Sequence, residues 1–119
     1  MTQVTINTTT IQAEIANTDE KRRQGLSGQP SLESKRGMLF IHEQASRHGY
    51  WMKEMQFPID IIWIGQDKHV VDITKNATPA SYPATFQPGR PAQYVLEVNA
   101  GFIDQYSIQV GNLTRFGQL

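Results

Sequence analysis

The chain has 119 residues, the size of one domain, and a chain of this length can bury enough apolar surface for a core without disulfide bonds. Eleven Lys and Arg residues balance eleven Asp and Glu residues, so no overall charge favours nucleic acid or an anionic membrane as a partner. The absence of cysteine excludes a disulfide scaffold, a thiolate metal site and a cysteine nucleophile.

No apolar run approaches the roughly 20 residues that are needed to cross a bilayer. The first residues also lack the basic and apolar regions of a signal peptide. We therefore expect a soluble globular domain without a membrane span, either cytoplasmic or an exported mature form from which a signal has been removed.

A short helix is predicted near residues 18–26. Asn17 suits the N-cap position, and Glu20 stands three residues later, as in a capping box. Gly25 or Gly28 can end the helix. Because so short a helix is marginal in water, its stability must come from packing against the rest of the domain.

Most of the remaining chain predicts strands, because apolar side chains alternate with polar ones or form short β-branched runs. Two strands are expected within residues 4–15, and others at 38–41, 49–53, 59–64, 70–73, 94–98 and 110–116. A helical turn is predicted near residues 101–107. Residues 77–92 hold four of the six prolines and predict a long loop, which in compact domains commonly binds something or closes a site.

These elements predict one mainly β domain over residues 1–119, an antiparallel sandwich or barrel of jelly-roll type with one or two short helices. The expected core residues are Leu39, Ile41, Ile61, Trp63, Val71, Leu96 and Val98.

Asp60 interrupts the most apolar segment of the chain, residues 59–64. In an extended strand, odd- and even-numbered residues of this segment face opposite sides, and both sides are otherwise apolar. The strand should therefore be central, with Asp60 in a dry region where an unpaired carboxylate is costly or takes up a proton. Asp60 needs a partner.

Lys53 and Glu97 are charges in other predicted strands. A Lys53 ammonium between Asp60 and Glu97 would satisfy all three groups, so we expect them to meet at one end of the central sheet, beside Trp51 and Tyr82. Two interpretations stay open. The three charges form a structural ion-pair network or reach solvent at strand ends, or they line a pocket in which Lys53 binds an anion or polar ligand.

Aromatic residues flank the apolar strand and the proline-rich loop, and they either anchor the core and loop or line a ligand site. They are Tyr50, Trp51, Tyr82, Phe86 and Tyr94. Arg90 lies between Gly89 and Pro91, where an arginine can clamp an anion. The three histidines match no zinc spacing and no glycine-rich phosphate loop occurs, so neither a metal nor a cofactor is expected.

Six segments in fixed order carry a resemblance to a known family. They are 20–28 (EKRRQGLSG), 37–40 (GMLF), 51–53 (WMK), 58–64 (PIDIIWI), 80–83 (ASYP) and 94–101 (YVLEVNAG). In order and spacing the chain resembles the domain-of-unknown-function 192 family, also called uncharacterised protein family 0127, over about residues 11–116.

The resemblance implies a mainly antiparallel β domain of jelly-roll or barrel kind with small outer helices, and it brings no established activity. Many relatives are exported or lipid-anchored. The family's Trp-Met-Lys, Pro-x-Asp and Leu-Glu-Val motifs fall on Trp51, Lys53, Asp60 and Glu97. Many relatives carry cysteines near the loop that here reads ASYPA (80–84). This chain has none, which argues against a thiol or metal role for the loop in this protein.

The leading functional hypothesis is a non-enzymatic binding or accessory domain for a small polar or anionic ligand, with a polar and aromatic pocket under the loop 77–92. The candidate ligand-binding residues are Trp51, Lys53, Asp60, Tyr82, Arg90 and Glu97. Two alternatives stay open. One is a structural or protein-interaction module, and the other is a hydrolase or lyase with Asp60 or Glu97 as general base and Lys53 as electrostatic stabiliser.

Overall fold

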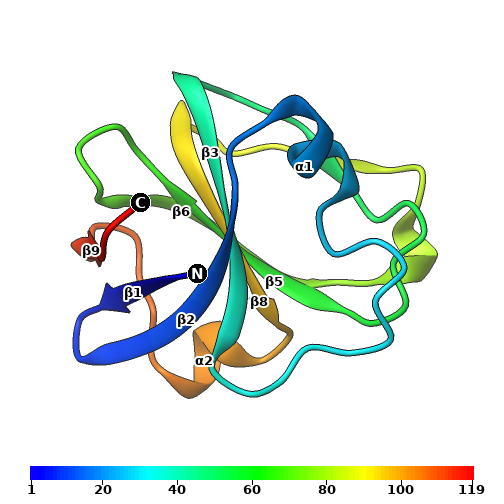
Figure 1. The fold of residues 1–119 in the computed structure, drawn as a ribbon, viewed down its shortest axis with the longest axis horizontal. Helices are drawn as coiled ribbons and strands as arrows, with labels where there is room; N and C mark the ends of the chain where they lie inside the picture. The colour runs from blue at the N-terminus through cyan, green and yellow to red at the C-terminus, as the bar shows by residue number, and fades with distance from the viewer.

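The computed structural model describes all residues 1–119. They form a curled sheet, a two-stranded ribbon and two short helices (Figure 1). The strands are β1 (Thr2–Ile6), β2 (Thr9–Ala16), β3 (Arg36–Ser46), β4 (Tyr50–Trp51), β5 (Ile59–Ile64), β6 (Val70–Ala77), β7 (Thr85–Phe86), β8 (Ala92–Asn99) and β9 (Thr114–Phe116). The helices are α1 (Asp19–Gln24) and α2 (Phe102–Gln105), and a 3₁₀ turn, η1, spans Pro79–Ser81. Neither helix is long and apolar enough to cross a membrane.

Seven strands form one half-barrel in the order β6-β5-β8-β3-β2-β1-β9, which confirms a mainly β domain with short helices. A jelly-roll arrangement is not confirmed. The sheet is also not wholly antiparallel, because β2 and β3 run parallel, from the pair Gln12 and Arg36 to the pair Ala16 and Phe40. Parallel neighbours need a crossover connection, and the chain supplies one that contains α1.

The two edge strands of the half-barrel approach each other through backbone hydrogen bonds. The Thr114 amide donates to the Lys68 carbonyl over 2.8 Å, and the Val70 amide donates to the Asn112 carbonyl over 2.8 Å. In Figure 1 the β9 segment accordingly lies beside the start of β6. These bonds occupy backbone groups that an open sheet edge would leave exposed.

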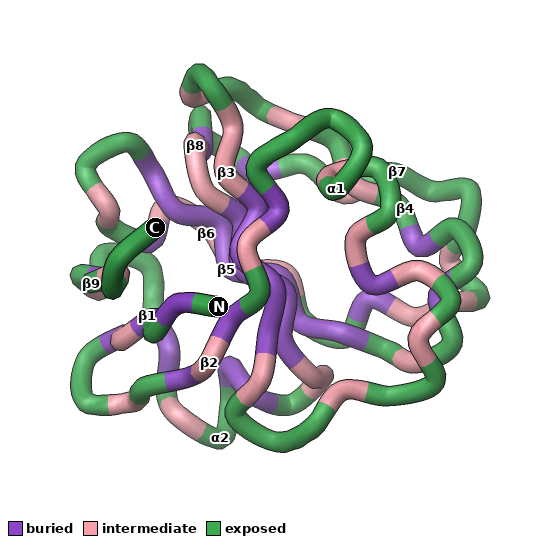
Figure 2. The backbone as a smooth tube through the Cα atoms, viewed as in Figure 1, coloured by how far each residue is buried: buried purple, intermediate pink, exposed green.

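Two separate cores cover the two faces of the sheet, and β5 is buried on both (Figure 2). One core lies inside the half-barrel and includes Leu39, Ile62, Ile64, Leu96 and Val98. The other lies under α1 and the β4–β7 ribbon and includes Leu26, Phe40, Ile61, Trp63 and Val95. Of the expected core residues, Ile41 and Val71 are only partly buried, because each lies towards the rim of its core.

The predicted helix forms, but its N-cap is Thr18 and not Asn17. Thr18 has an extended backbone, and its Oγ1 accepts a hydrogen bond from the Lys21 amide over 3.1 Å. Gly25 ends the helix with a φ of 49°, a conformation that favours glycine. The next residue, Leu26, is 2% exposed and docks the helix on the sheet.

Residues 77–92 are not the single long loop that their prolines predict. Strand β6 runs to Ala77, the turn η1 follows, and β7 pairs with β4 before β8 begins. Elsewhere the strands expected at 49–53 and 110–116 shrink to β4 and β9, whereas β3 and β8 are longer than predicted. Strand β4 pairs with β7 over two residues, and β9 pairs with β1 over three, so neither extends further.

Asp60 is 1% exposed, and its partners are backbone amides. Its Oδ1 accepts from the Asn76 amide over 2.9 Å. Its Oδ2 accepts from the Gly101 amide over 3.1 Å and from the Ile103 amide over 3.0 Å. One carboxylate therefore joins β5 to the end of β6 and to the start of α2. The sequence correctly predicts that Asp60 is buried and needs partners, but not which groups provide them.

Replacing Asp60 with Asn should lower the free energy of unfolding by about 3 kcal/mol, because an amide cannot accept all three hydrogen bonds and carries no charge to strengthen them. Urea denaturation measures the change. The control Asp104→Asn removes an exposed ion pair between Lys75 and α2, the helix that Asp60 also contacts. It should lower the free energy of unfolding by less than about 1 kcal/mol. Equal effects of the two substitutions would contradict the structural role of Asp60.

Candidate functional site

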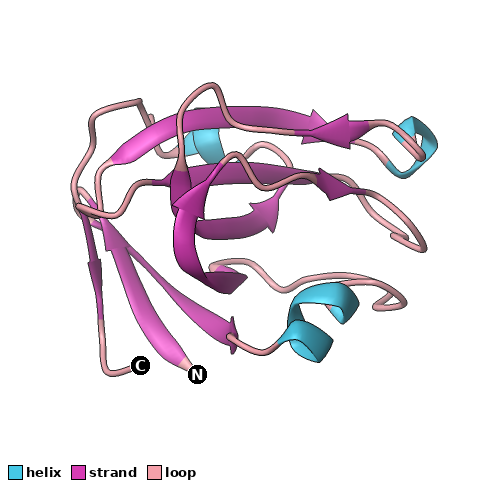
Figure 3. Ribbon diagram, turned by 90° about the horizontal axis from the view of Figure 1, so that it is seen from above, coloured by secondary structure: helices cyan, strands magenta, loops and turns pink.

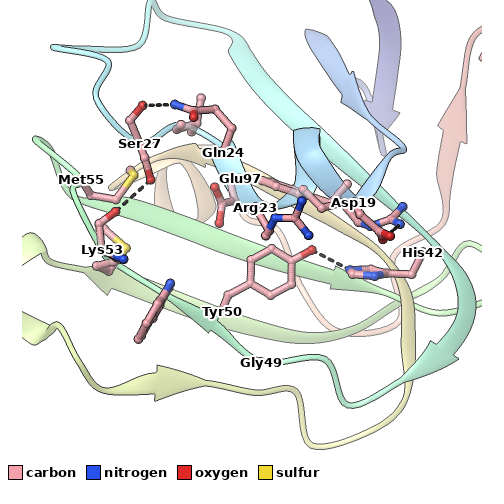
Figure 4. A pocket seen from close by; sticks show the side chains of 16 residues that line it. Asp19, Arg23, Gln24, Ser27, His42, Gly49, Tyr50, Lys53, Met55 and Glu97 are labelled. Carbon is pink, nitrogen blue, oxygen red and sulfur yellow. Dashed lines mark hydrogen bonds and ion pairs between the residues drawn. The ribbon is translucent and has the colours of Figure 1, made fainter.

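Figure 3 shows that α1 lies to one side of the sheet strands, directly after β2. A cavity of about 430 Å³ lies between α1 with its following loop and residues 49–55, above β3 and β8 (Figure 4). We call it the α1 cavity. Its apolar lining comes from Leu26, Phe40, Trp51, Met52 and Met55. Its polar and charged lining comes from Asp19, Arg22, Arg23, Gln24, Ser27, His42, Tyr50, Lys53 and Glu97.

The loop after α1 is tied directly to the segment after β4, and these bonds hold the rim of the cavity. The Ser27 hydroxyl donates to the Lys53 carbonyl over 2.8 Å, and the Gly28 amide donates to the Glu54 carbonyl over 2.9 Å. The Gln24 side-chain amide donates to the Ser27 carbonyl over 2.9 Å. The first two bonds cross from the loop after α1 to the segment after β4, so they hold the rim from both sides.

Glu97 lies on the floor of the cavity. Strand β8 places it between Met38 of β3 and Ile61 of β5, and its residue is 6% exposed. The carboxyl group lines the cavity and makes no hydrogen bond to another group of the protein, and its oxygens keep a little accessible surface. In Figure 4 it lies between the Ser27–Lys53 side and the Tyr50–His42 side. Burial raises the pKa of Glu97 to about 8, so the group is mostly protonated at neutral pH.

Tyr50 and His42 form a hydrogen-bonded pair beside Glu97. The Tyr50 hydroxyl lies 2.7 Å from His42 Nε2, and the His42 ring stacks on His48 with 3.6 Å between centroids. Burial, and then the charges of His48 and Arg22, lower the pKa of His42 to about 4. Burial and a nearby Glu97 charge raise the pKa of Tyr50. Both members of the pair are therefore neutral at pH 7.

The mouth of the cavity carries positive charge. Arg22 donates to Asp19 Oδ1 and to the Ile41 carbonyl, each over 2.7 Å, so its charge is balanced and its side chain is held. Arg23 and Lys53 belong to no ion pair. Lys53 Nζ lies 5.6 Å from the centre of the Trp51 ring. With Glu97 protonated, the cavity has two uncompensated cations.

The structure brings three of the six predicted ligand-binding residues to this cavity: Trp51, Lys53 and Glu97. Tyr82 packs on Trp51 with 5.0 Å between ring centroids but lies outside the lining, and both rings are about half exposed. Arg90 lies in a different, shallow hollow beside the β5–β6 turn. No residue of 77–92 lines the α1 cavity, so the cavity does not lie under the proline-rich segment.

The predicted meeting of Lys53, Asp60 and Glu97 is wrong. In the β5–β8 ladder Ile61 is paired with Glu97, whereas Asp60 is paired with Val98. Neighbouring pairs in a ladder face opposite sides of the sheet, so Asp60 enters the inner core and Glu97 enters the α1 cavity. Lys53 forms no ion pair with either carboxyl group.

Sequence reasoning missed the contributions of Arg22, Arg23 and His42. In the sequence, Arg22 and Arg23 look like a solvated helix face, and His42 looks like a polar residue at a strand end. Only the docking of α1 above β3 brings them to one place. The sequence marks only the two arginines, because both lie within the family-like segment 20–28. Nothing in the sequence marks His42.

The protonated state of Glu97 predicts how stability varies with pH. The folded protein holds this proton more tightly than the unfolded chain, in which the pKa is near 4.5. The unfolded state therefore binds fewer protons between pH 4.5 and 8, and stability falls as pH rises through that window, then levels off. The loss should total roughly 5 kcal/mol.

Urea denaturation between pH 5 and 9 measures this loss as the difference between the protein and its Glu97→Gln variant, which has no such proton. The exposed control Glu14→Gln should follow the unmodified protein at every pH. If the Glu97→Gln curve ran parallel to that of the unmodified protein, Glu97 would not be the buried acid described here.

Comparisons with known proteins agree with the sequence resemblance. A UPF0127 protein of Pyrococcus furiosus is 35% identical over 75 residues, which is 63% of this chain, and the match spans only 59% of that relative's length. A crystal structure of a protein of unknown function from Novosphingobium aromaticivorans has a TM-score of 0.89 and 28% identity, covering 95% of this chain and 83% of that one. A candidate transcription regulator from Sinorhizobium meliloti has a TM-score of 0.92 and 28% identity, covering 98% of this chain and 94% of that one.

The family model matches almost the whole chain, from residue 2 to residue 116. The protein therefore belongs to the DUF192 family, described as "Uncharacterized ACR, COG1430".

Proposed function

We propose that this protein is a small-molecule binding domain and that the α1 cavity is its binding site. The observation that carries the proposal is the Glu97 carboxyl group, which is buried, has no partner in the protein and faces the cavity. Polar groups with so little exposure are nearly always hydrogen-bonded to the protein or to water, so the partner of Glu97 must come from within the cavity. A bound molecule can be that partner.

The other buried carboxylate makes the contrast clear. Asp60 has three backbone partners and contributes to the fold. Glu97 has none, and a leucine at that place would pack without the cost of desolvating an acid. Folding alone therefore does not account for an acid at position 97.

The size and lining of the cavity support a small ligand. A volume of about 430 Å³ lies within the usual range of ligand pockets, roughly 300–1,000 Å³. Five apolar and nine polar or charged side chains line the same space, so the cavity can hold a molecule that has both kinds of surface. Met52 and Met55 are flexible side chains that can adapt to the outline of a bound molecule.

Replacing Glu97 with Leu should separate stability from binding. The variant should be more stable at pH 7.5 by about 1–3 kcal/mol, because it removes a buried, unpaired acid. In a fragment screen followed by protein NMR, molecules that shift the Trp51 indole and Met55 methyl signals of the unmodified protein should bind this variant about tenfold more weakly.

The matched control is Glu14→Leu, which makes the same replacement on an exposed position of β2 and should change neither fragment binding nor the cavity signals. If no fragment in a chemically diverse library shifted the cavity signals, the cavity would not be a binding site. If fragments bound Glu97→Leu as tightly as the unmodified protein, Glu97 would take no part in recognising the ligand.

A second candidate function is a hydrolase or lyase in which Glu97 transfers a proton and Lys53 stabilises a developing negative charge. The neutral Tyr50–His42 pair beside an acid with a pKa of about 8 favours it, because acid–base catalysts work best with a pKa near the operating pH. Asp60 cannot be the base, since three amides occupy its oxygens on the other face of the sheet. Chemical conversion of a bound fragment that is lost in Glu97→Gln would favour the enzyme over the binding domain.

A further inference from the structure

We infer that the ligand of the α1 cavity is a small organic anion, with a carboxylate at its outer end, an apolar body and a neutral polar group at its inner end. The inference rests on the proposed function and names the ligand class of the same site. It follows from three layers of side chains that lie between the mouth of the cavity and its floor.

The outer layer favours negative charge. Arg23 and Lys53 line the mouth and take part in no ion pair, whereas the charge of Arg22 is balanced by Asp19 at 2.7 Å. A guanidinium can bind a carboxylate through two parallel hydrogen bonds, and an ammonium adds a third donor. A ligand carboxylate at the mouth would therefore find two unoccupied cationic partners.

The inner layer favours a neutral polar group. A protonated Glu97 offers one hydrogen-bond donor and one acceptor, which suits a hydroxyl or carbonyl group. An ammonium group there would require Glu97 to ionise and would add a cation to a cavity that already holds uncompensated positive charge. The inner end of the ligand is thus polar but uncharged.

The middle layer favours an apolar body. Leu26, Phe40, Met52 and Met55 form the walls between mouth and floor, and the Trp51 ring stands half exposed at the opening. A body about the size of one aromatic ring matches these walls and leaves room for a polar group at each end, within a volume of about 430 Å³.

Ionisation of Glu97 should weaken the binding of an anion, because it removes the donor on the floor and adds a negative charge there. Elements on every side of Glu97 contribute charged or titratable groups that share the cavity with it. They are Asp19, Arg22 and Arg23 from α1, His42 from β3, Tyr50 from β4 and Lys53 from the segment after β4. His42 and Tyr50 are both neutral at pH 7, so the negative charge that appears near pH 8 belongs to Glu97.

Three probes with one body and different charges test the inference: 3-(4-hydroxyphenyl)propionate, its neutral amide and 3-(4-hydroxyphenyl)propylamine. Titrations followed by calorimetry and NMR at pH 7.2 should show that the carboxylate binds most tightly, the amide next and the amine most weakly. The affinities of the carboxylate and the amide should differ about tenfold. At pH 9.2 the carboxylate should bind about tenfold more weakly, and Glu97→Gln, which keeps a donor but cannot ionise, should bind it equally at both pH values.

Arg23→Gln and Lys53→Gln should each lower the affinity for the carboxylate about threefold to tenfold and leave the affinity for the amide unchanged. Both side chains are exposed, so these variants should fold normally, and Lys21→Gln on α1 is the matched control outside the cavity lining. The pH series on the unmodified protein needs no variant and tests the same idea independently.

The possible failures are distinguishable. If the amide or the amine bound as tightly as the carboxylate, the anion would be the wrong class, while the α1 cavity would still be a binding site. If none of the three probes bound but library fragments did, the anion inference would again fail alone. If neither probes nor fragments shifted the cavity signals, the proposed function would fail, and the inference with it.

Discussion

The pairing of β5 with β8 is the constraint on which the rest of the structure depends. Strand β5 is buried on both faces, so its apolar side chains enter one or the other of the two cores. The register sets Ile61 beside Glu97 and Asp60 beside Val98. A shift of one residue would exchange the faces of both acids and of every apolar neighbour, so the two cores together hold the register in place.

The two buried acids show how the same kind of residue stabilises or destabilises a fold according to its surroundings. Asp60 meets three amides whose positions are set by the end of β6 and the start of α2, and it joins these elements. Glu97 faces a cavity and meets no donor, so burial raises its pKa to about 8 and favours its protonated form. The first arrangement serves the fold, and the second leaves a hydrogen-bonding group free for another molecule.

The sequence could predict what depends on alternation within a strand, including the burial of Asp60 and its need for partners. It could not predict the partners, because they are backbone amides from distant parts of the chain, and the side-chain pattern does not show which amides come close to Asp60. Lys53 looked like the natural counter-charge for Asp60 and Glu97, yet residues from adjacent ladder pairs face opposite sides. The cavity itself depends on where α1 docks, which is a long-range property that local patterns do not encode.

The position of the cavity follows from the topology. Because β2 and β3 are parallel, the chain between them must cross over a face of the sheet, and α1 lies in that crossover. The crossover is held by Leu26 and by bonds from Ser27 and Gly28 to the segment after β4. Between these attachments and the sheet lies the space above Glu97. The α1 cavity is therefore built by the connection that makes the sheet mixed, and the residues of that connection, Arg22 and Arg23 among them, determine what the cavity can accept.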